Sequence, residues 1–207
     1  MKDPIQRAST TALWPRYLAW LLLVSAMVLL PSCAAIIGAG TDEPIQTDPG
    51  KRPFGTYIND ENLEVIARIN LDKAHPDLKK ASIQVNVFNG VALLTGQVAS
   101  ESLRRLAAAT VNDINSIRQL HNELQVQGNL SLLSQTNDTW LANKVKAKLL
   151  AHREVQGSRI KVIAEDGTIY LMGLVSRAEA EKVTGIVSST SGIQQVVRVF
   201  EYIDINR

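Results

Sequence analysis

Apolar and polar positions follow the same order twice along this chain of 207 residues. Apolar residues recur at helical spacing in residues 63–71 and again in residues 141–149. Each of these segments is followed by two short apolar stretches, which are joined at Asn89-Gly90 in the first case and at Asp166-Gly167 in the second. Asn-Gly and Asp-Gly tolerate the positive φ angles of a tight turn, so each pair predicts a β-hairpin.

The repetition extends to the residues themselves. SIQVNVFNGVALLTGQV (82–98) aligns with RIKVIAEDGTIYLMGLV (159–175), and SIRQLHNELQV (116–126) aligns with GIQQVVRVFEY (192–202). The spacing between matched segments shrinks by one residue twice, as small loop deletions would produce. The chain is therefore a two-copy duplication, and each copy of about 65–70 residues is large enough for a modest core of its own.

Each copy has the order helix, strand, strand, helix, strand. Asp60 and Asp138 stand where the first helix of each copy is expected to start, and aspartate is a good N-cap residue. Ser176-Arg177-Ala178-Glu179 is a capping-box pattern that predicts the start of the second helix of copy two. A final strand, around 117–126 or 193–203, closes each unit. The sequence predicts an α+β fold of two tandem αββαβ units, each a three-stranded sheet covered by two helices.

Two apolar residues of copy one lie outside its core stripe. On the first helix, Val65 and Ile69 point away from Leu63 and Leu71, so a single core does not need them. We expect them to help pack copy one against copy two; a slightly wider core stripe is the alternative.

The N-terminal segment has a different composition. Lys2, Arg7 and Arg16 precede the apolar run LAWLLLVSAMVLL (18–30), and small residues follow it. This layout is typical of a secretory signal peptide, and the run is shorter than the roughly 20 apolar residues that a membrane-spanning helix needs. An uncleaved N-terminal anchor is the alternative.

The single cysteine, Cys33, directly follows this run. Leu30-Pro31-Ser32-Cys33 resembles a bacterial lipobox, in which the cysteine thiol is acylated and the preceding residues are removed. No second cysteine exists to form a disulfide. Each buried methylene of an acyl chain contributes about 0.8 kcal/mol, so several chains would hold the protein on a membrane. Cys33 is the expected lipid anchor, and Ala34, where an aspartate would favour retention at the inner membrane, suggests the outer one.

The charge of the mature chain argues against nucleic-acid binding. Removing the leader takes away Lys2, Arg7, Arg16 and Asp3, so 22 basic and 20 acidic residues become 19 and 19. A nucleic-acid-binding protein would usually have a net basic surface. The neutral balance leaves room only for a local basic patch.

The sequence also lacks the residue patterns that are typical of catalytic and metal-binding sites. The three histidines, His75, His121 and His152, do not stand at metal-ligand spacing, and no second cysteine could act as a ligand. The glycines near the hairpins are explained by backbone geometry rather than by phosphate binding. We predict no catalytic residue, no metal ligand and no cofactor.

The αββαβ order, the hairpins ending in LLTGQV (93–98) and LMGLV (171–175), and the late Gly192-Ile193 with Val196 resemble the BON domain. A lipobox followed by two such domains resembles the dual BON-domain lipoproteins of the Gram-negative outer membrane, the DolP type. This resemblance implies a non-enzymatic envelope protein that recognises phospholipid, preferably anionic, through the first helix of its second domain. It also implies support of outer-membrane integrity near the division site.

The expected domain boundaries follow from these assignments. The segment after Cys33 is rich in Gly, Pro, Thr and Asp and lacks a sustained period, so it is expected to be a tether. The segments are a signal peptide in 1–32, the acylated cysteine and flexible tether in 33–58, BON domain 1 in 59–126, a linker in 127–136 and BON domain 2 in 137–205.

The helix predicted in NDTWLANKVKAKLL (137–150) carries one aromatic residue, Trp140, on the face opposite its core stripe. An exposed aromatic residue with lysine-rich flanks is typical of an interfacial membrane contact. The indole prefers the headgroup boundary, and each lysine near an anionic surface contributes roughly 1 kcal/mol. The expected phospholipid-binding residues are Trp140, Lys144, Lys146, Ala147, Lys148 and Leu150.

Two alternatives stay open. Trp140 could instead pack against the other domain or against the linker 127–136, which contains Leu130, Leu132 and Leu133. At the level of function, the alternative to a lipid-binding module is a periplasmic adaptor that docks on cell-wall-remodelling or outer-membrane assembly machinery.

Overall fold

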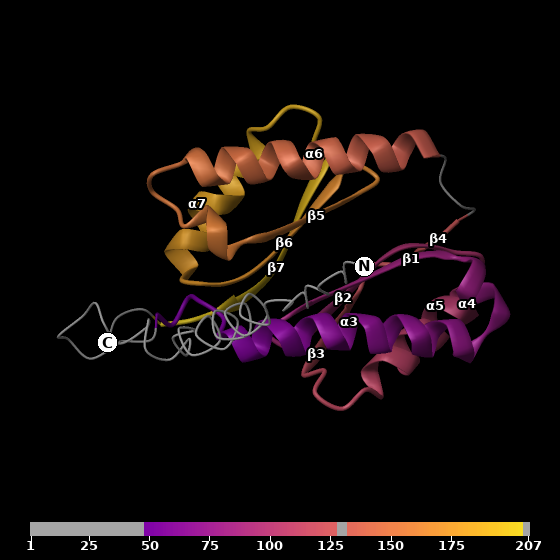
Figure 1. Cartoon of the computed structure of the whole chain (residues 1–207). Coiled ribbons are helices and arrows are strands. Elements are labelled where there is room, and N and C mark those ends of the chain that lie inside the picture. Colours follow the sequence, from indigo (N-terminus) through magenta and orange to yellow (C-terminus); the bar gives the residue numbers. More distant parts are fainter. Residues whose placement is uncertain (1–47, 128–131, 205–207) are drawn as a thin grey trace, which may run out of the picture. The chain divides into compact units, whose positions relative to one another are not determined.

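The computed structural model describes residues 48–127 and 132–204 (Figure 1). The expected signal peptide, the Cys33 anchor and most of the tether lie outside the described residues. The described residues all belong to one compact unit, Thr47–Arg207. We refer to residues 54–126 as repeat 1 and to residues 132–202 as repeat 2.

Repeat 1 has the predicted order of elements with one addition. A short helix, α4, follows the first long helix, and the last strand is interrupted, so that β3 and β4 both pair with β2. The bounds are α3 (Phe54–Ala74), α4 (Pro76–Lys80), β1 (Ser82–Phe88), β2 (Val91–Val98), α5 (Glu101–Asn112), β3 (Gln119–Asn122) and β4 (Gln125–Val126).

Repeat 2 repeats this arrangement with a 3-10 turn, η1, in place of the short helix. In both repeats the first two strands are antiparallel and the last strand runs parallel to the second. The bounds are α6 (Leu132–Ala151), η1 (Gly157–Arg159), β5 (Lys161–Glu165), β6 (Thr168–Val175), α7 (Arg177–Ser188) and β7 (Gln195–Tyr202). The α+β fold of two tandem αββαβ units, predicted from the sequence, is confirmed.

The two hairpin turns have the predicted conformation. Asn89 and Gly90 have φ angles of 53° and 74°, and Asp166 and Gly167 have φ angles of 48° and 72°. Positive φ at both central residues is the geometry of a type I′ turn, whose twist matches that of the flanking strands. These turns fix the register of each hairpin, with Phe88 opposite Val91 and Glu165 opposite Thr168.

Asp60 and Asp138 are not N-caps, which corrects the expectation from the sequence. The helices begin earlier, at Phe54 and Leu132, so both aspartates lie inside helices and are buried. Each carboxylate accepts hydrogen bonds from the two backbone N–H groups of the hairpin turn of its own repeat. Asp60 binds the N–H groups of Asn89 and Gly90 at 2.7 and 2.9 Å, and Asp138 binds those of Asp166 and Gly167 at 2.8 and 3.0 Å.

Each repeat has a core between its helices and one face of its sheet. In repeat 2 this core contains Leu141, Val145 and Leu149 of α6 together with Val183 of α7 and Leu171 of β6. Repeat 1 has the corresponding core from α3, α5 and the β1–β2 hairpin. The helical spacing in residues 63–71 and 141–149 therefore marked the buried faces correctly.

A third cluster of buried residues contains side chains from both repeats, and it explains how the repeats pack within the unit. It is formed by the other faces of the sheets, not by α3: Val65 and Ile69 are 59% and 46% exposed. The expectation that these two residues join the copies is therefore wrong. Both β2 and β6 are buried along their whole length because each has a core on either side. The shared cluster comprises Phe88, Val91, Leu93, Ile163, Tyr170, Met172, Leu174 and Val199.

Glu165 connects the repeats at the edge of this shared cluster. Its carboxylate accepts hydrogen bonds from the side-chain amides of Gln84, at 3.2 Å, and Gln97, at 2.9 Å. Burial raises the pKa of Glu165, the hydrogen bond from Gln97 opposes this rise, and the carboxylates of Asp138 and Asp166 add to it. Within the described part of the chain, Gln97 Oε1 is buried and has no partner. Burial therefore makes the charged form of Glu165 less favourable in the folded chain than in water.

We expect Glu165→Gln to remove a pH dependence of stability. Because the pKa of Glu165 is raised above its ordinary value of 4.5, the folded chain binds this proton more tightly than the unfolded chain does. The free energy of unfolding therefore falls as pH rises from 4.5 through the raised value. Glu165→Gln should match the parent at pH 4 and exceed it at pH 7 in urea unfolding. Glu154→Gln, at an exposed glutamate, is the control. An equal difference from the parent at both pH values would contradict this account.

Candidate functional site

Helix α6 presents an exposed strip on the side away from its core. Trp140 and Leu150 are each 57% exposed, and Ala147 between them is exposed as well. No acidic residue occurs between positions 139 and 151. Trp140 thus lies on the solvent-facing side that the helical spacing predicted, and more than half of its surface is free of packing.

Lys144 and Lys148 are held beside this strip by the end of α7 and the residues that follow it, up to Ser191. The ammonium of Lys144 lies 4.7 Å from the centre of the Trp140 ring and donates to Ser191 O and Oγ at 3.0 and 2.8 Å. Lys148 donates to Ile186 O, Ser189 Oγ and Thr190 Oγ1 at 2.9 to 3.0 Å. The free carbonyls at a helix C-terminus carry partial negative charge, so they stabilise these ammonium groups. One positive charge therefore lies against the exposed indole, and a second lies about two turns further along α6.

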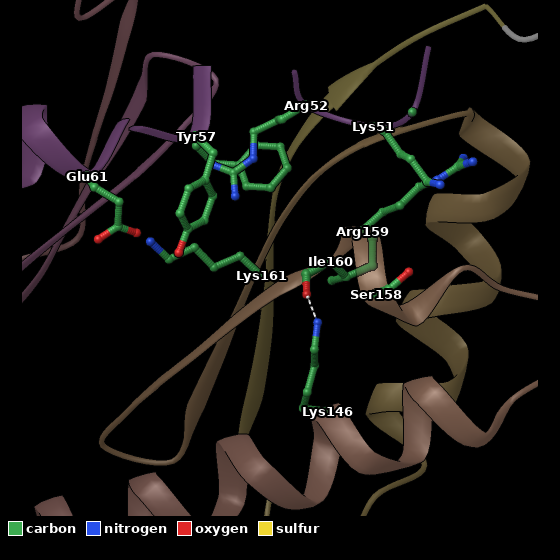
Figure 2. A pocket seen from close by; sticks show the side chains of 11 residues that line it. Lys51, Arg52, Tyr57, Glu61, Lys146, Ser158, Arg159, Ile160 and Lys161 are labelled. Carbon is green, nitrogen blue, oxygen red and sulfur yellow. Dashed lines mark hydrogen bonds between the residues drawn. The ribbon is translucent and has the colours of Figure 1, made fainter. Parts of the chain in front are cut away.

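Lys146 is separated from the other predicted residues. Its ammonium turns away from Lys144 and Lys148 and donates to Gly157 O at 2.9 Å. It also donates to Ile160 O at 2.6 Å (Figure 2). Burial lowers the pKa of Lys146. The structure therefore brings Trp140, Lys144, Ala147, Lys148 and Leu150 to one surface, which we call the α6 strip, and leaves Lys146 outside it.

The corresponding helix of repeat 1 has different chemistry. Asn62 occupies the position of Trp140, and Glu61, Glu64 and Asp72 lie along α3. Glu64 forms an ion pair with Lys161 at 2.5 Å, whereas Glu61 is exposed. Helix α3 also exposes aromatic residues, Phe54 and Tyr57, but its single lysine, Lys73, lies at its other end. On α6, by contrast, an exposed aromatic residue has a lysine against its ring.

Metal-binding clusters and membrane-spanning helices were also sought in the described residues. Among them no group of three His, Cys, Asp or Glu side chains is arranged to hold a metal ion. Within the same residues, no helix has the length and apolar character to cross a bilayer.

The structure also contains a cleft that was not predicted from the sequence. It is lined by Lys51, Arg52, Lys146, Arg159 and Lys161 (Figure 2), and the first two residues had been assigned to the flexible tether. Helix α3 starts at Phe54, within the expected tether, and Arg52 is bound to Asp60 at 2.6 Å. The only available signal was the run of Lys51-Arg52 just before the aromatic residues 54 and 57.

The fold and the α6 strip together describe a protein built from two small αββαβ modules. The BON domain family matches this chain twice, at residues 59–128 and 137–204, and the chain belongs to that family. The chain is 32% identical over 185 residues to outer membrane lipoprotein DolP of Haemophilus influenzae, which covers 88% of this chain and 95% of the relative. It is therefore a dual BON-domain protein of the DolP type.

Two further relatives also match most of this chain and most of their own length. The chain is 32% identical to a 21 kDa hemolysin of Actinobacillus pleuropneumoniae, over 78% of this chain and 82% of the relative. It is 25% identical to osmotically-inducible protein Y of Escherichia coli, over 82% of this chain and 90% of the relative. The similarity thus spans both repeats in proteins of comparable length.

Proposed function

We propose that this protein is a non-enzymatic lipoprotein of the outer membrane that binds anionic phospholipid through the α6 strip. The acylated Cys33 is the proposed anchor, and the folded repeats face the periplasm. Support of envelope integrity, with enrichment at the division septum, is the role that the family resemblance implies. The observation that carries the proposal is the exposed Trp140 with the ammonium of Lys144 4.7 Å from its ring.

The geometry of the strip suits a bilayer surface. An indole can insert at the headgroup boundary, where its ring is apolar and its N–H stays hydrated. Leu150 would add apolar contact on the same side of α6, and Lys144 and Lys148 would attract anionic headgroups. Such a contact is weak alone, but a tether at Cys33 would give the repeats a high effective concentration at the membrane. A weak site is then sufficient to select where on the membrane the protein settles.

A periplasmic adaptor is the second candidate function, and one observation favours it. Helix α3 exposes Phe54, Ile58, Val65 and Ile69 at spacings that place them along one side of the helix. Contiguous exposed apolar residues are typical of protein-interaction surfaces. The two functions are compatible because the α3 side chains belong to repeat 1 and the α6 strip to repeat 2.

We expect Trp140→Glu to abolish binding to anionic vesicles while both repeats stay folded. Burying an aromatic side chain contributes about 2 kcal/mol, so its loss weakens binding by roughly 30-fold, and the added carboxylate is repelled by the anionic surface. The measurement is co-sedimentation with phosphatidylcholine vesicles that contain phosphatidylglycerol. The chain should begin at Ala34, so that no acyl group holds it on the vesicles and every described residue is kept.

Asn62→Glu is the matched control because it adds the same charge at the equivalent position of α3. This control should bind like the parent, and binding of both should rise with the share of phosphatidylglycerol and fall with salt. If Trp140→Glu bound as well as Asn62→Glu, the α6 strip would not be the lipid site. If the parent bound no vesicle of either composition, the adaptor function would remain.

A further inference from the structure

The cleft beside α6 is a separate candidate site with its own chemistry. It has a volume of about 510 Å³ and is lined by residues from three parts of the described chain: the segment before α3, the α3 helix with Phe88, and the region from α6 through η1 to β5. Figure 2 shows the side chains of Lys51, Arg52, Lys146, Arg159 and Lys161 around it, with Tyr57 on the side of repeat 1. Volumes of several hundred Å³ are typical of small-molecule sites.

Three of the five cationic side chains already have carboxylate partners. Arg52 pairs with Asp60 at 2.6 Å, Lys161 pairs with Glu64 at 2.5 Å, and Arg159 pairs with Asp48. The cleft's own carboxylate, Glu61, is exposed and lies on α3. Lys51 and Lys146 are therefore the two cationic side chains of the cleft that have no ion-pair partner among the described residues.

Lys146 is partly buried without a counter-ion. Its ammonium is held by two carbonyl oxygens, Gly157 O and Ile160 O, and it forms no ion pair with any described carboxylate. Burying an ammonium group is unfavourable unless a negative charge compensates it. Lys51 lines the same cleft, is exposed and has no ion-pair partner among the described residues. Two uncompensated positive charges thus lie along one cavity.

Arg159 adds a third cationic side chain to the same part of the cleft. Its side chain is only 9% exposed, and its Nε is buried with no hydrogen-bond partner in the described chain. Buried guanidinium N–H groups are nearly always bonded to an acceptor. Arg159 lines the cleft, so a ligand bound there would lie beside its guanidinium and change the environment of this N–H.

The opposite side of the cleft offers an aromatic surface. The guanidinium of Arg52 stacks at 3.8 Å from the ring centre of Phe88 and 5.3 Å from that of Tyr57. Tyr57 keeps 45% of its surface exposed. A phosphate alone would fill a small part of 510 Å³, so the remaining space beside Tyr57 fits an organic group.

We propose that this cleft binds a phosphate ester of a small polar molecule, with the phosphate between Lys146 and Arg159 and the organic part against Tyr57. Lys51 and Lys146 lack ion-pair partners and Glu61 supplies one negative charge, so the lining keeps a net positive charge that a phosphate would balance. The phosphate oxygens can accept from the ammonium groups beside the guanidinium of Arg159. The cleft does not depend on the proposed membrane contact, because the one α6 residue that lines it, Lys146, is not part of the α6 strip.

The test is a titration of the chain that begins at Ala34 with sn-glycerol 3-phosphate, followed by nuclear magnetic resonance. The Nε–Hε signal of Arg159 should shift and saturate, and glycerol without phosphate should not move it. Lys146→Met should weaken the affinity about tenfold or more, and Lys51→Met, which breaks no described contact, should weaken it as well. Lys79→Met removes the same charge from the exposed surface of α4 and should leave the affinity unchanged.

Two further arms identify the ligand's source and the part played by Tyr57. The parent should bind glycerol 3-phosphate more tightly than inorganic phosphate, and Tyr57→Ala should bind the two with equal affinity. If phosphatidylglycerol vesicles shift Arg159 Nε–Hε in the Trp140→Glu variant, the phosphate belongs to a lipid headgroup; if only the soluble ester does, the ligand is a soluble phosphate ester. The absence of a saturable shift at millimolar ester, or an affinity unchanged in both Lys146→Met and Lys51→Met, would overturn the proposal.

Discussion

Asp138→Ala is expected to destabilise repeat 2 by about 2–4 kcal/mol, because it removes the acceptor of two backbone N–H groups. The carboxylate of Asp138 binds the N–H groups of Asp166 and Gly167, and it is 6% exposed. Without it both donors stay buried and unpaired in a turn that has positive φ at each central residue. Urea unfolding followed by circular dichroism measures the loss, and faster amide exchange at Asp166 and Gly167 would locate it.

The equivalent change in repeat 1 should cost at least as much. Asp60 binds the turn in the same way and in addition pairs with Arg52, which would be left without a partner. Asp72→Ala is the control, because that aspartate is part of a surface pair with Arg68 at 3.9 Å and such pairs contribute little. If Asp138→Ala lost no more stability than Asp72→Ala, the aspartate–turn contact would not hold helix and hairpin together.

This contact also links stability to the proposed function. Asp138 lies two residues before Trp140, so the bond to the hairpin turn fixes the part of α6 that carries the indole. Loss of that bond would disorder the α6 strip before it unfolds the whole repeat. Reduced vesicle binding by Asp138→Ala should therefore accompany the loss of turn protection.

The local features of the fold were predictable from short sequence patterns. Asn89-Gly90 and Asp166-Gly167 have few conformations other than the tight turn, so the hairpins followed directly. Ser176 caps α7 as expected by accepting from Glu179 N–H at 3.1 Å. In a complete capping box the Glu179 carboxylate would accept from the backbone N–H of Ser176. Here it accepts from the N–H of Gln156, which lies in another loop, so only the serine half of the capping box is formed.

Features that depend on distant parts of the chain were not predictable in the same way. The aspartates looked like N-caps because nothing in the local pattern revealed that the helices start earlier, at Phe54 and Leu132. A helical projection gives the side on which Lys146 lies, but not the carbonyl oxygens of residues 157 and 160 that hold it. The direction of a side chain is local, whereas its partner is a property of the tertiary fold.

The sequence did contain a signal for the packing of the two repeats, but it lies in strands β2 and β6 and not in the first helix, where the contact was expected. β2 (VALLTGQV) and β6 (TIYLMGLV) are almost continuously apolar, which is typical of strands that are buried on both faces. A sheet covered by helices on one side only would show a polar residue at every second position. The continuous runs therefore predict a second buried face on each sheet, and the exposed Val65 and Ile69 are not needed for it.

Gly96→Ala is expected to disrupt the β1–β2 hairpin of repeat 1. Gly96 has a φ of +109°, a conformation that costs a residue with a side chain roughly 1–3 kcal/mol. A Cβ atom there would lie 1.8 Å from Ser82 O and 2.9 Å from Ser82 C. Since these atoms are backbone of the paired strand, relief requires the two strands to separate. The total cost should exceed about 3 kcal/mol, a large fraction of the stability of a small domain.

Gly173→Ala in repeat 2 is the matched control for Gly96→Ala, because the two glycines align between the repeats. At Gly173 the nearest atoms to a Cβ would be Ile160 Cδ1 at 3.0 Å and Arg159 O at 3.2 Å, and its φ lies outside the left-handed region. Ile160 can move slightly, so a loss of about 1 kcal/mol is expected.

In the chain that begins at Ala34, Trp140 is the only tryptophan, so its fluorescence follows repeat 2 while circular dichroism follows both repeats. Gly96→Ala should lower the circular dichroism signal at urea concentrations where Trp140 fluorescence is still native. Equal shifts of both signals in the two variants would mean that the close approach of Gly96 to Ser82 does not limit the stability of repeat 1.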